Sequence, residues 1–204
     1  MAAEKRSFRE SRIYPVIFML VITVFFVGIL AYFYNSTKLT VMQYNELILK
    51  RSILKTFDLP LDNVEKAFSK HITEIKNSGI TYYQGEINRE VLGYCYMISG
   101  PGLWGTIDAL ITLTPDLTEI INIEIVKHNE TPGLGSRISE DWFKEQFKGK
   151  LVLVNDNVQT FQLVSEDEIE TAGQIRQVTG ATFSSKAVVD MIVKEMKKIK
   201  ETSN

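Results

Sequence analysis

The chain of 204 residues contains one cysteine, Cys95, and two histidines, His71 and His128. A single cysteine cannot form an internal disulfide, and it cannot supply the thiolate cluster of a structural metal site. The two histidines are far apart in the sequence and do not have the spacing of a metal-binding motif. Cys95 lies in an apolar, strand-like segment, where we interpret it as a packed residue rather than a reactive thiol. We therefore expect no metal site.

Clusters of basic residues are also lacking in the globular part of the chain. The sequence has 23 Lys and Arg residues against 25 Asp and Glu residues, and its formal net charge is −2. Proteins that bind nucleic acids present a basic patch to the phosphate backbone, and the scattered lysines here do not form one. The sequence contains no internal repeat and no low-complexity stretch. We therefore expect no nucleic-acid partner.

Charge is missing altogether from residues 13–34, which are mostly Val, Ile, Leu and Phe. A helix of this length crosses a hydrocarbon core of about 30 Å. A cleaved signal peptide is the alternative, but its apolar region has about 7 to 15 residues and is followed by small residues. Here the run ends in the bulky sequence Tyr32-Phe33-Tyr34. We interpret residues 13–34 as a single membrane-spanning helix.

The charges that flank this run indicate its orientation. Four basic residues precede it, whereas only Lys38 follows closely; the four are Lys5, Arg6, Arg9 and Arg12. Cytoplasmic flanks of membrane helices are enriched in Lys and Arg. We therefore expect residues 1–12 to be cytoplasmic and the rest of the chain to be extracytoplasmic, anchored in the cell (inner) membrane.

Between the span and the globular part, residues 35–70 are expected to form a helical stalk. Residues 41–57 carry apolar side chains at helical spacing, and the pattern ends before Leu59-Pro60. Residues 62–68 then predict a short helix, in which Asp62 and Glu65 have the spacing of a capping box.

Residues 71–204 are expected to form an α+β domain with an antiparallel sheet and flanking helices. Four runs rich in β-branched and aromatic residues predict strands at 80–83, 90–98, 106–113 and 119–126, and the segments between them are too short for crossover helices. A further candidate strand covers residues 151–154. Amphipathic helices are predicted at 138–147, with Trp142, Phe143 and Phe147 directed inward, and at 184–200.

The segment Thr179-Gly180-Ala181-Thr182-Phe183-Ser184-Ser185 precedes the last predicted helix. The unpaired N–H groups and positive dipole end of a helix N-terminus favour an anion, and Gly180 allows a close approach of the backbone. The same residues taken alone also fit an ordinary hydroxyl N-cap.

Two further segments have the composition of ligand-binding loops. Residues 100–105 interrupt two strands with three glycines, a proline and Trp104, whose indole offers a flat face. A tight turn with a core tryptophan is the alternative. Residues 128–135 form a second candidate loop, fixed by two glycines and a proline, in which Glu130 supplies an acceptor and Thr131 a hydroxyl. An ordinary surface loop is the alternative there.

Together these segments resemble the FMN-binding domain of the RnfG and NqrC subunits of ion-translocating membrane oxidoreductases. The resemblance rests on the N-terminal anchor, the Gly-Leu-Trp-Gly turn at 102–105, the Glu-Thr-Pro-Gly-Leu-Gly loop at 130–135 and the Thr-Gly-Ala-Thr sequence at 179–182, in the family's order. The compact length favours RnfG over NqrC.

The resemblance implies that FMN is joined through its phosphate to Thr182, by a flavin transferase that uses FAD as donor. It implies that Trp104 and Leu134 lie against the isoalloxazine. The remaining residues implied to bind the cofactor are Gly102, Leu103, Glu130, Thr131, Gly133, Gly135, Thr179, Gly180, Ala181, Ser184 and Ser185. One position departs from the family's pattern, because Arg176 stands where an acidic residue usually precedes the acceptor threonine by six positions.

The function implied is that of an electron carrier within a larger enzyme. The partners would be the other membrane subunits of an Rnf-type or Nqr-type complex, which move Na+ or H+. The sequence offers no acid–base pair for substrate chemistry of its own, so no catalytic residue is expected. Two alternatives remain, namely a stand-alone membrane-anchored flavoprotein that feeds an extracytoplasmic reductase, and a flavin-free assembly module on the same scaffold.

Overall fold

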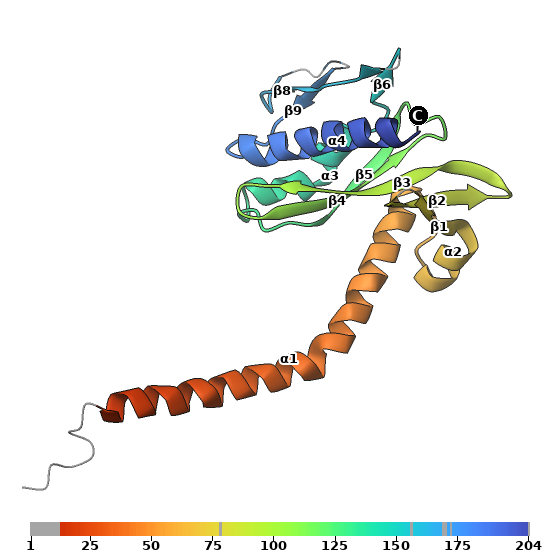
Figure 1. Cartoon of the computed structure of the whole chain (residues 1–204). Coiled ribbons are helices and arrows are strands. Elements are labelled where there is room, and N and C mark those ends of the chain that lie inside the picture. Colours follow the sequence, from red (N-terminus) through yellow and green to blue (C-terminus); the bar gives the residue numbers. More distant parts are fainter. Residues whose placement is uncertain (1–12, 78, 156, 169–170, 172, 204) are drawn as a thin grey trace, which may run out of the picture. The chain divides into compact units, whose positions relative to one another are not determined.

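The computed structural model describes residues 13–77, 79–155, 157–168, 171 and 173–203 (Figure 1). The chain divides between Glu46 and Leu47 into two compact units, which are described separately. The basic residues that precede the predicted membrane span lie outside the described part of the chain.

Helix α1 runs from Ile13 to Thr56. Its described residues up to Glu46 belong to the first unit, and the rest belong to the second. In the part of the chain that the structure describes, α1 is the one helix long and apolar enough to cross a membrane. We expected a membrane span at 13–34 followed by a helical stalk at 35–70, and α1 continues from the span into the stalk as far as Thr56. Neither Pro nor Gly occurs between Gly28 and Pro60, so nothing in this stretch breaks the helix.

The second unit contains a five-stranded antiparallel sheet in the order β1-β2-β3-β4-β5 (Figure 1). The predicted antiparallel sheet is confirmed, and the observed strands are β1 Ile72–Asn77, β2 Ile80–Ile87, β3 Glu90–Pro101, β4 Thr106–Leu113 and β5 Ile120–Lys127. Strand β1 was not predicted. It lies at the sheet edge and most of its side chains are solvated, so its sequence lacks a strong apolar signal.

The short helix predicted at 62–68 is α2, which runs from Val64 to His71. Its N-cap is Asn63 rather than the predicted Asp62, because the Asn63 side chain accepts a hydrogen bond from the Lys66 N–H at 3.1 Å. An N-cap amide oxygen satisfies one of the unpaired donors of the first helical turn.

Both faces of the sheet are buried, each in its own core. Successive residues of a strand point to opposite faces, so Ala109 and Ile111 lie in one core while Leu110 lies in the other. The larger core packs under α4, which runs from Thr182 to Ser203 and lies across the sheet face (Figure 1). The smaller core contains Ile53 and Leu54 from the last turns of α1.

Phe57, the residue directly after α1, packs tightly against the sheet. A methyl group built on Gly85 of β2 would lie 2.6 Å from the Phe57 ring, well inside van der Waals contact. Gly85 therefore makes room for this ring, and the Phe57 side chain is buried. The folded second unit consequently includes residues that the sequence assigned to the stalk.

The segment after β5 differs from the single helix predicted at 138–147. It forms a 3-10 turn, η2 Gly135–Ser139, and a short helix, α3 Asp141–Glu145. Phe143 and Phe147 are fully buried as predicted, whereas Trp142 is only half-buried. Two small two-stranded sheets follow, made of β6 Leu153–Val154 with β7 Asn157–Val158, and of β8 Gln162–Val164 with β9 Gln174–Arg176.

Candidate functional site

The sheet topology brings the predicted turn and loop to one end of the sheet. The turn at 102–105 joins β3 to β4, and the Gly102 N–H donates to the Gly105 carbonyl at 2.7 Å. The segment at 128–135 follows β5, whose last residue, Lys127, pairs with Asp108 near the start of β4. The antiparallel register therefore places the two segments side by side.

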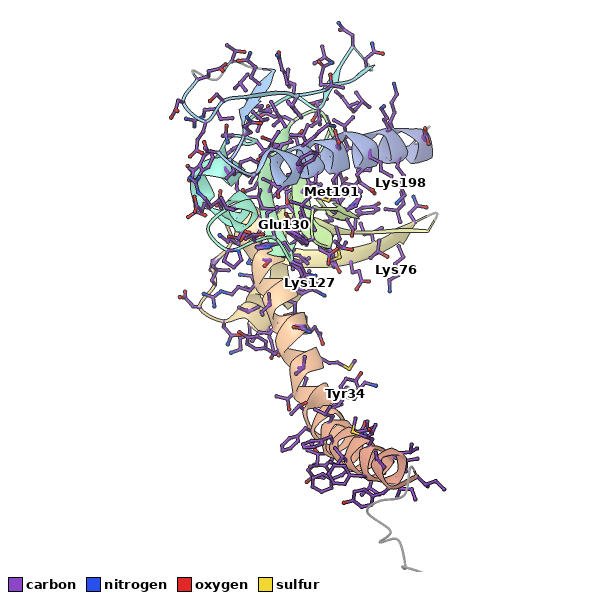
Figure 2. All side chains as sticks on the ribbon, turned by 90° about the vertical axis from the view of Figure 1, so that its left-hand side faces the viewer. Tyr34, Lys76, Lys127, Glu130, Met191 and Lys198 are labelled. Carbon is purple, nitrogen blue, oxygen red and sulfur yellow. The ribbon has the colours of Figure 1, made fainter. Side chains whose placement is uncertain are left out.

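Glu130 ties all three predicted segments together. One carboxyl oxygen, Oε1, accepts hydrogen bonds from the backbone N–H groups of Leu103 at 2.9 Å and Trp104 at 3.2 Å. The other, Oε2, accepts the hydroxyl of Ser184 in the first turn of α4 at 2.5 Å. Glu130 is 5% exposed, and Figure 2 labels it on the loop that follows β5. Glu130 is therefore the buried residue that joins the three segments.

Two of the predicted glycines are required by the position of Glu130. A methyl group on Gly102 would collide with Glu130 Oε1, and one on Gly135 would lie 2.6 Å from Ser184 Oγ and 2.8 Å from Glu130 Oε2. Each glycine lets its backbone approach the buried carboxyl group. His128, for which no role was predicted, accepts the Glu130 N–H on Nδ1 at 3.2 Å and so fixes the start of the loop.

The hydroxyls of Ser184 and Ser185 have partners inside the protein. Ser184 donates to Glu130, while Ser185 donates to the Ala181 carbonyl at 3.1 Å and accepts the Val178 N–H at 2.9 Å. Both residues are buried. Each hydroxyl has one hydrogen to donate, so these side chains hold the segment in shape and do not direct donors at an external phosphate.

The segment that leads into α4 is closely packed. Gly180 has φ of +76°, a left-handed conformation that glycine adopts without strain. A methyl group there would lie 3.2 Å from Leu134 Cδ2, which places the second loop against this segment. Thr182 is the first residue of α4 and is exposed, whereas Ala181 is buried. The helix N-terminus therefore presents the Thr182 side chain to solvent, beside the open N–H groups of the first turn.

Several large apolar side chains at this end of the domain are exposed to solvent. Leu103 is 55% exposed, Trp104 67%, Leu134 47% and Phe183 72%. Phe183 was not among the predicted contact residues. An exposed group of apolar side chains of this kind is typical of a binding surface. Around it, Leu103 and Phe183 line a shallow cavity of about 240 Å³ with Lys186 and Asp190, so the site is an open surface rather than an enclosed pocket.

The outer side of the second loop is open as well. A methyl group on Gly133, whose φ is +74°, would meet nothing within 4 Å. The loop is closed by its own hydrogen bonds, since the Gly133 N–H donates to Ser136 Oγ at 3.0 Å and the Leu134 N–H to the Thr131 carbonyl at 3.2 Å. Thr131 itself is exposed.

Glu166 and Arg137 support the same segment, and neither was predicted. Glu166 pairs with the Arg137 guanidinium through two hydrogen bonds of 2.8 and 3.2 Å, and it accepts the Thr179 N–H at 2.8 Å. The hydrogen bonds from Arg137 and from Thr179 lower the pKa of Glu166 to about 2. The pair links the middle of η2 to the start of the Thr-Gly-Ala-Thr sequence, across distances in the sequence that no local pattern reveals.

Arg176, the position that departs from the family's pattern, faces a different environment. Its backbone N–H donates to Gln146 Oε1 at 2.7 Å, and its guanidinium lies over the Trp142 ring at 5.9 Å from the centroid. In the described residues, no group of three or more His, Cys, Asp or Glu side chains is arranged to hold a metal ion.

Comparison with known proteins agrees with this geometry. Residues 102–196 match the model of the FMN-binding domain family. Over 111 residues the chain is 36% identical to the G subunit of the proton-translocating ferredoxin:NAD(+) oxidoreductase complex of Clostridium ljungdahlii, a match that covers 52% of this chain and 53% of that protein. It is 28% identical to the G subunit of the ion-translocating oxidoreductase complex of Methanosarcina acetivorans, covering 87% of this chain and 88% of that one.

The chain thus aligns with about half the length of the Clostridium relative. Among solved structures, the C subunit of the Na(+)-translocating NADH-quinone reductase of Parabacteroides distasonis superposes with a TM-score of 0.68 at 20% identity, covering 80% of this chain and 96% of that one. This likeness supports the α+β fold. The resemblance inferred from the sequence is confirmed: residues 102–196 match the FMN-binding domain family, and the chain is similar to subunits of the RnfG and NqrC type.

Proposed function

We propose that this protein is the FMN-carrying electron-transfer subunit of an Rnf-type ion-translocating oxidoreductase complex, with FMN joined through its phosphate to Thr182. The observation that carries the proposal is the exposed Thr182 side chain at the first turn of α4, which directly follows the left-handed Gly180 and Ala181. Sequence similarity to the G subunits of such complexes supports the partner and the reaction.

The residues present fit an FMN group. The N-terminus of α4 offers backbone N–H groups to the phosphate, and Gly180 keeps that approach free of a side chain. Trp104 and Leu134 supply exposed apolar surface for an isoalloxazine ring, and Leu103 and Thr131 border it. In this proposal, Glu130 holds the surrounding loops in place and does not contact the ring.

Attachment at Thr182 is a phosphoryl transfer. In the flavin transferase, the Thr182 Oγ would form the new bond to the phosphorus of the FMN half of FAD, the bond from that phosphorus to the AMP half would break, and AMP and the hydroxyl proton would be released. Because the link runs through the phosphate, the ring remains chemically unmodified, and its surroundings set its potential. The attachment prevents loss of the cofactor.

FMN, when bound, accepts and donates electrons one or two at a time. This chain's own part is to hold that group at the rim of the domain. The open surface formed by Trp104, Leu134 and Phe183 leaves one side accessible to a neighbouring redox protein. We propose that other membrane subunits of the complex supply the electron donor and acceptor and move the ion.

The covalent assignment is tested by producing the full chain together with its flavin transferase and viewing a denaturing gel under ultraviolet light. A fluorescent band is expected for the wild-type chain and for Thr73→Val, and none for Thr182→Ala. Thr73 is the matched control because it is an exposed threonine on β1, outside the three segments of the site. A band that persists in Thr182→Ala would refute Thr182 as the acceptor, and a dark wild-type band would favour the flavin-free assembly module.

The same proposal places residues 13–34 in the membrane, residues 1–12 in the cytoplasm and the FMN-binding domain outside it, with residues 35–70 as the connecting segment. The long apolar helix α1 and the basic flank that precedes it support this arrangement. Reporter proteins fused to the C-terminus test it, since an enzyme that is active only outside the cytoplasm should be active there. Activity of a cytoplasmic reporter would reverse the orientation.

An NqrC-type protein is the second candidate, favoured by the structural likeness to the NADH-quinone reductase protein of Parabacteroides distasonis. Purification in mild detergent followed by identification of the co-purifying proteins separates the two candidates. Recovery with Rnf-type subunits supports the first proposal, and recovery with Nqr-type subunits supports the second. A chain that purifies alone would indicate the stand-alone flavoprotein.

A further inference from the structure

A cavity that the proposed function does not use lies beside the turn that joins β4 to β5, where Pro115 and Leu117 contribute to its walls. Its volume is about 300 Å³, at the lower end of the range of about 300–1,000 Å³ that is typical of small-molecule sites. The candidate FMN site lies at the other end of β4, and a strand of 8 residues separates the two ends by about 20 Å. None of the residues assigned to FMN lines this cavity.

Three tyrosines from two neighbouring strands line the cavity, and we call it the tyrosine cavity. Tyr82 of β2 pairs directly with Tyr96 of β3, and Tyr94 lies two residues before Tyr96 on the same face of the sheet. The Tyr82 ring stacks on the Tyr96 ring with centroids 5.3 Å apart, and it meets the Tyr94 ring edge-to-face at 5.7 Å. The three rings therefore hold one another in place.

The hydroxyl groups of these tyrosines have no hydrogen-bond partner among the described residues. Tyr96 is the most informative of the three, because the residue is only 6% exposed and its hydroxyl is nevertheless not enclosed by protein. Since Tyr96 lines the tyrosine cavity, we infer that its hydroxyl opens into that space. A polar group this deep in a protein normally has a partner, so the Tyr96 hydroxyl is a preformed donor for a ligand.

The walls of the tyrosine cavity favour an uncharged ligand. The described residues that line it include no Asp, Glu, Lys, Arg or His, so a buried charge would have no compensating group there. Burial, reinforced by the neighbouring Tyr82 and Tyr94, raises the pKa of Tyr96 to about 12. The phenol is therefore protonated at neutral pH and donates its hydrogen, and the matching group on a ligand is an oxygen acceptor.

The wall formed by the turn between β4 and β5 has a fixed shape. Leu117 has φ of +60°, a left-handed conformation that is uncommon and strained for a residue with a side chain. The turn is held by Asp116, whose carboxyl group accepts the Thr114 hydroxyl and the Thr118 N–H. Leu117 is thereby held in the wall of the cavity, where it also packs against the larger core. A preformed apolar wall lowers the ordering cost of binding.

We propose that the tyrosine cavity is a binding site for a small uncharged carbonyl compound with an apolar body. The carbonyl oxygen would accept the hydroxyl hydrogen of Tyr96, and the apolar body would contact Leu117 and Ile80, which line the same cavity. The site does not depend on the attachment of FMN at Thr182.

Calorimetric titration of the purified full chain in detergent tests the proposal with two water-soluble probes, and a titration of detergent alone is subtracted. Benzamide is uncharged and has a carbonyl oxygen, whereas benzoate has nearly the same shape and carries a negative charge. Benzoate should bind at least about tenfold more weakly than benzamide, because its charge would be buried without a partner. Failure of benzamide to bind at millimolar concentration, or equal binding of the two probes, would overturn the proposal.

Two tyrosine variants locate the site. Tyr96→Phe removes only the hydroxyl, which has no partner in the protein, so the fold should be kept while benzamide binds about fivefold more weakly. Tyr83→Phe is the matched control, because Tyr83 follows Tyr82 on β2 but packs against the smaller core on the opposite face of the sheet. It should bind benzamide as the wild type does. Unchanged affinity in Tyr96→Phe, or an equal loss in both variants, would refute the assignment of the donor.

Discussion

Ser184 donates its hydroxyl hydrogen to Glu130 Oε2 at 2.5 Å, although the two residues are 54 positions apart in the sequence. Both side chains are buried, and the second carboxyl oxygen receives the backbone of the Gly-Leu-Trp-Gly turn at Leu103 and Trp104. A single carboxyl group therefore joins the three segments whose sequences indicated a flavin site. Through this contact, segments that are far apart in the sequence form one site.

Removal of the Ser184 hydroxyl should destabilise the domain. Ser184→Ala leaves a buried carboxyl oxygen without its donor, and we expect a loss of about 1–3 kcal/mol in the free energy of unfolding, measured with urea. Flavin incorporation should fall with it, because the start of α4 loses its connection to the loop at Glu130.

Ser99 is the matched control for this variant. It also donates to a carboxyl group, that of Asp108 at 2.6 Å, but the pair is exposed on the same sheet. Ser99→Ala should therefore change the unfolding free energy by no more than about 0.5 kcal/mol. Ser184→Ala should add little to Glu130→Ala, because residues in direct contact are energetically coupled. Fully additive losses would contradict the proposed role of the pair.

The sequence predicted the segments of the site but not their connections. Hydrophobic alternation indicated β3, β4 and β5, and local glycines and hydroxyls marked the turn, the loop and the start of α4. Burial is a property of the assembled fold, and so Ser184 was interpreted as a phosphate ligand although it points inward. The carboxyl group of Glu166, brought to Thr179 by the fold, had no local signal at all.

The fold elements that escaped prediction are those stabilised by tertiary contacts. Strand β1 has a polar sequence and is specified by pairing with β2, and β7 and β9 have only two and three residues. The helix predicted at 138–147 is divided into η2 and α3. Propensity over a window of ten residues does not resolve such a division, because packing against the sheet determines it.

The packing of Phe57 on Gly85 predicts a strong dependence of stability on both residues. Phe57→Ala should cost about 3–5 kcal/mol through the cavity that it leaves. Gly85→Ala should also destabilise the domain, because its new methyl group would lie 2.6 Å from the ring. The measurement is urea unfolding of the detergent-solubilised chain.

A double-mutant cycle checks the cause of this effect. In the Phe57→Ala background the clash is absent, so Gly85→Ala should then cost much less than it does alone. Gly173→Ala serves as a control, since a methyl group there meets nothing within 4 Å. An undiminished cost of Gly85→Ala without the ring would assign the effect to the backbone instead.

The ion pair of Glu166 with Arg137 predicts an acid dependence of stability. The hydrogen bond from Arg137 is the main reason why the pKa of Glu166 lies at about 2 in the folded chain, below its ordinary value of 4.5. A lowered pKa means that the carboxylate stabilises the fold above pH 4.5 and that this contribution is lost as the pH falls toward about 2. Glu166→Gln should therefore be less stable than the wild type at neutral pH, and the difference should shrink across this interval. A difference that stays constant from neutral pH down to the folded pKa would exclude the ion pair as its source.

Burial of Cys95 predicts an unreactive thiol in the folded protein. Cys95 is fully buried against the last turns of α1, and burial raises its pKa to about 11, although the nearby hydroxyl groups of Thr112 and Thr56 oppose that rise. Because the thiolate is the reactive form, a disulfide reagent at about pH 8 should modify Cys95 only when urea unfolds the chain. Met97→Cys, combined with Cys95→Ala, provides an exposed thiol on the same strand, since Met97 is 43% exposed. That thiol should react at once in the folded chain, and equal rates for the two positions would show that the contact between the end of α1 and the sheet opens readily in solution.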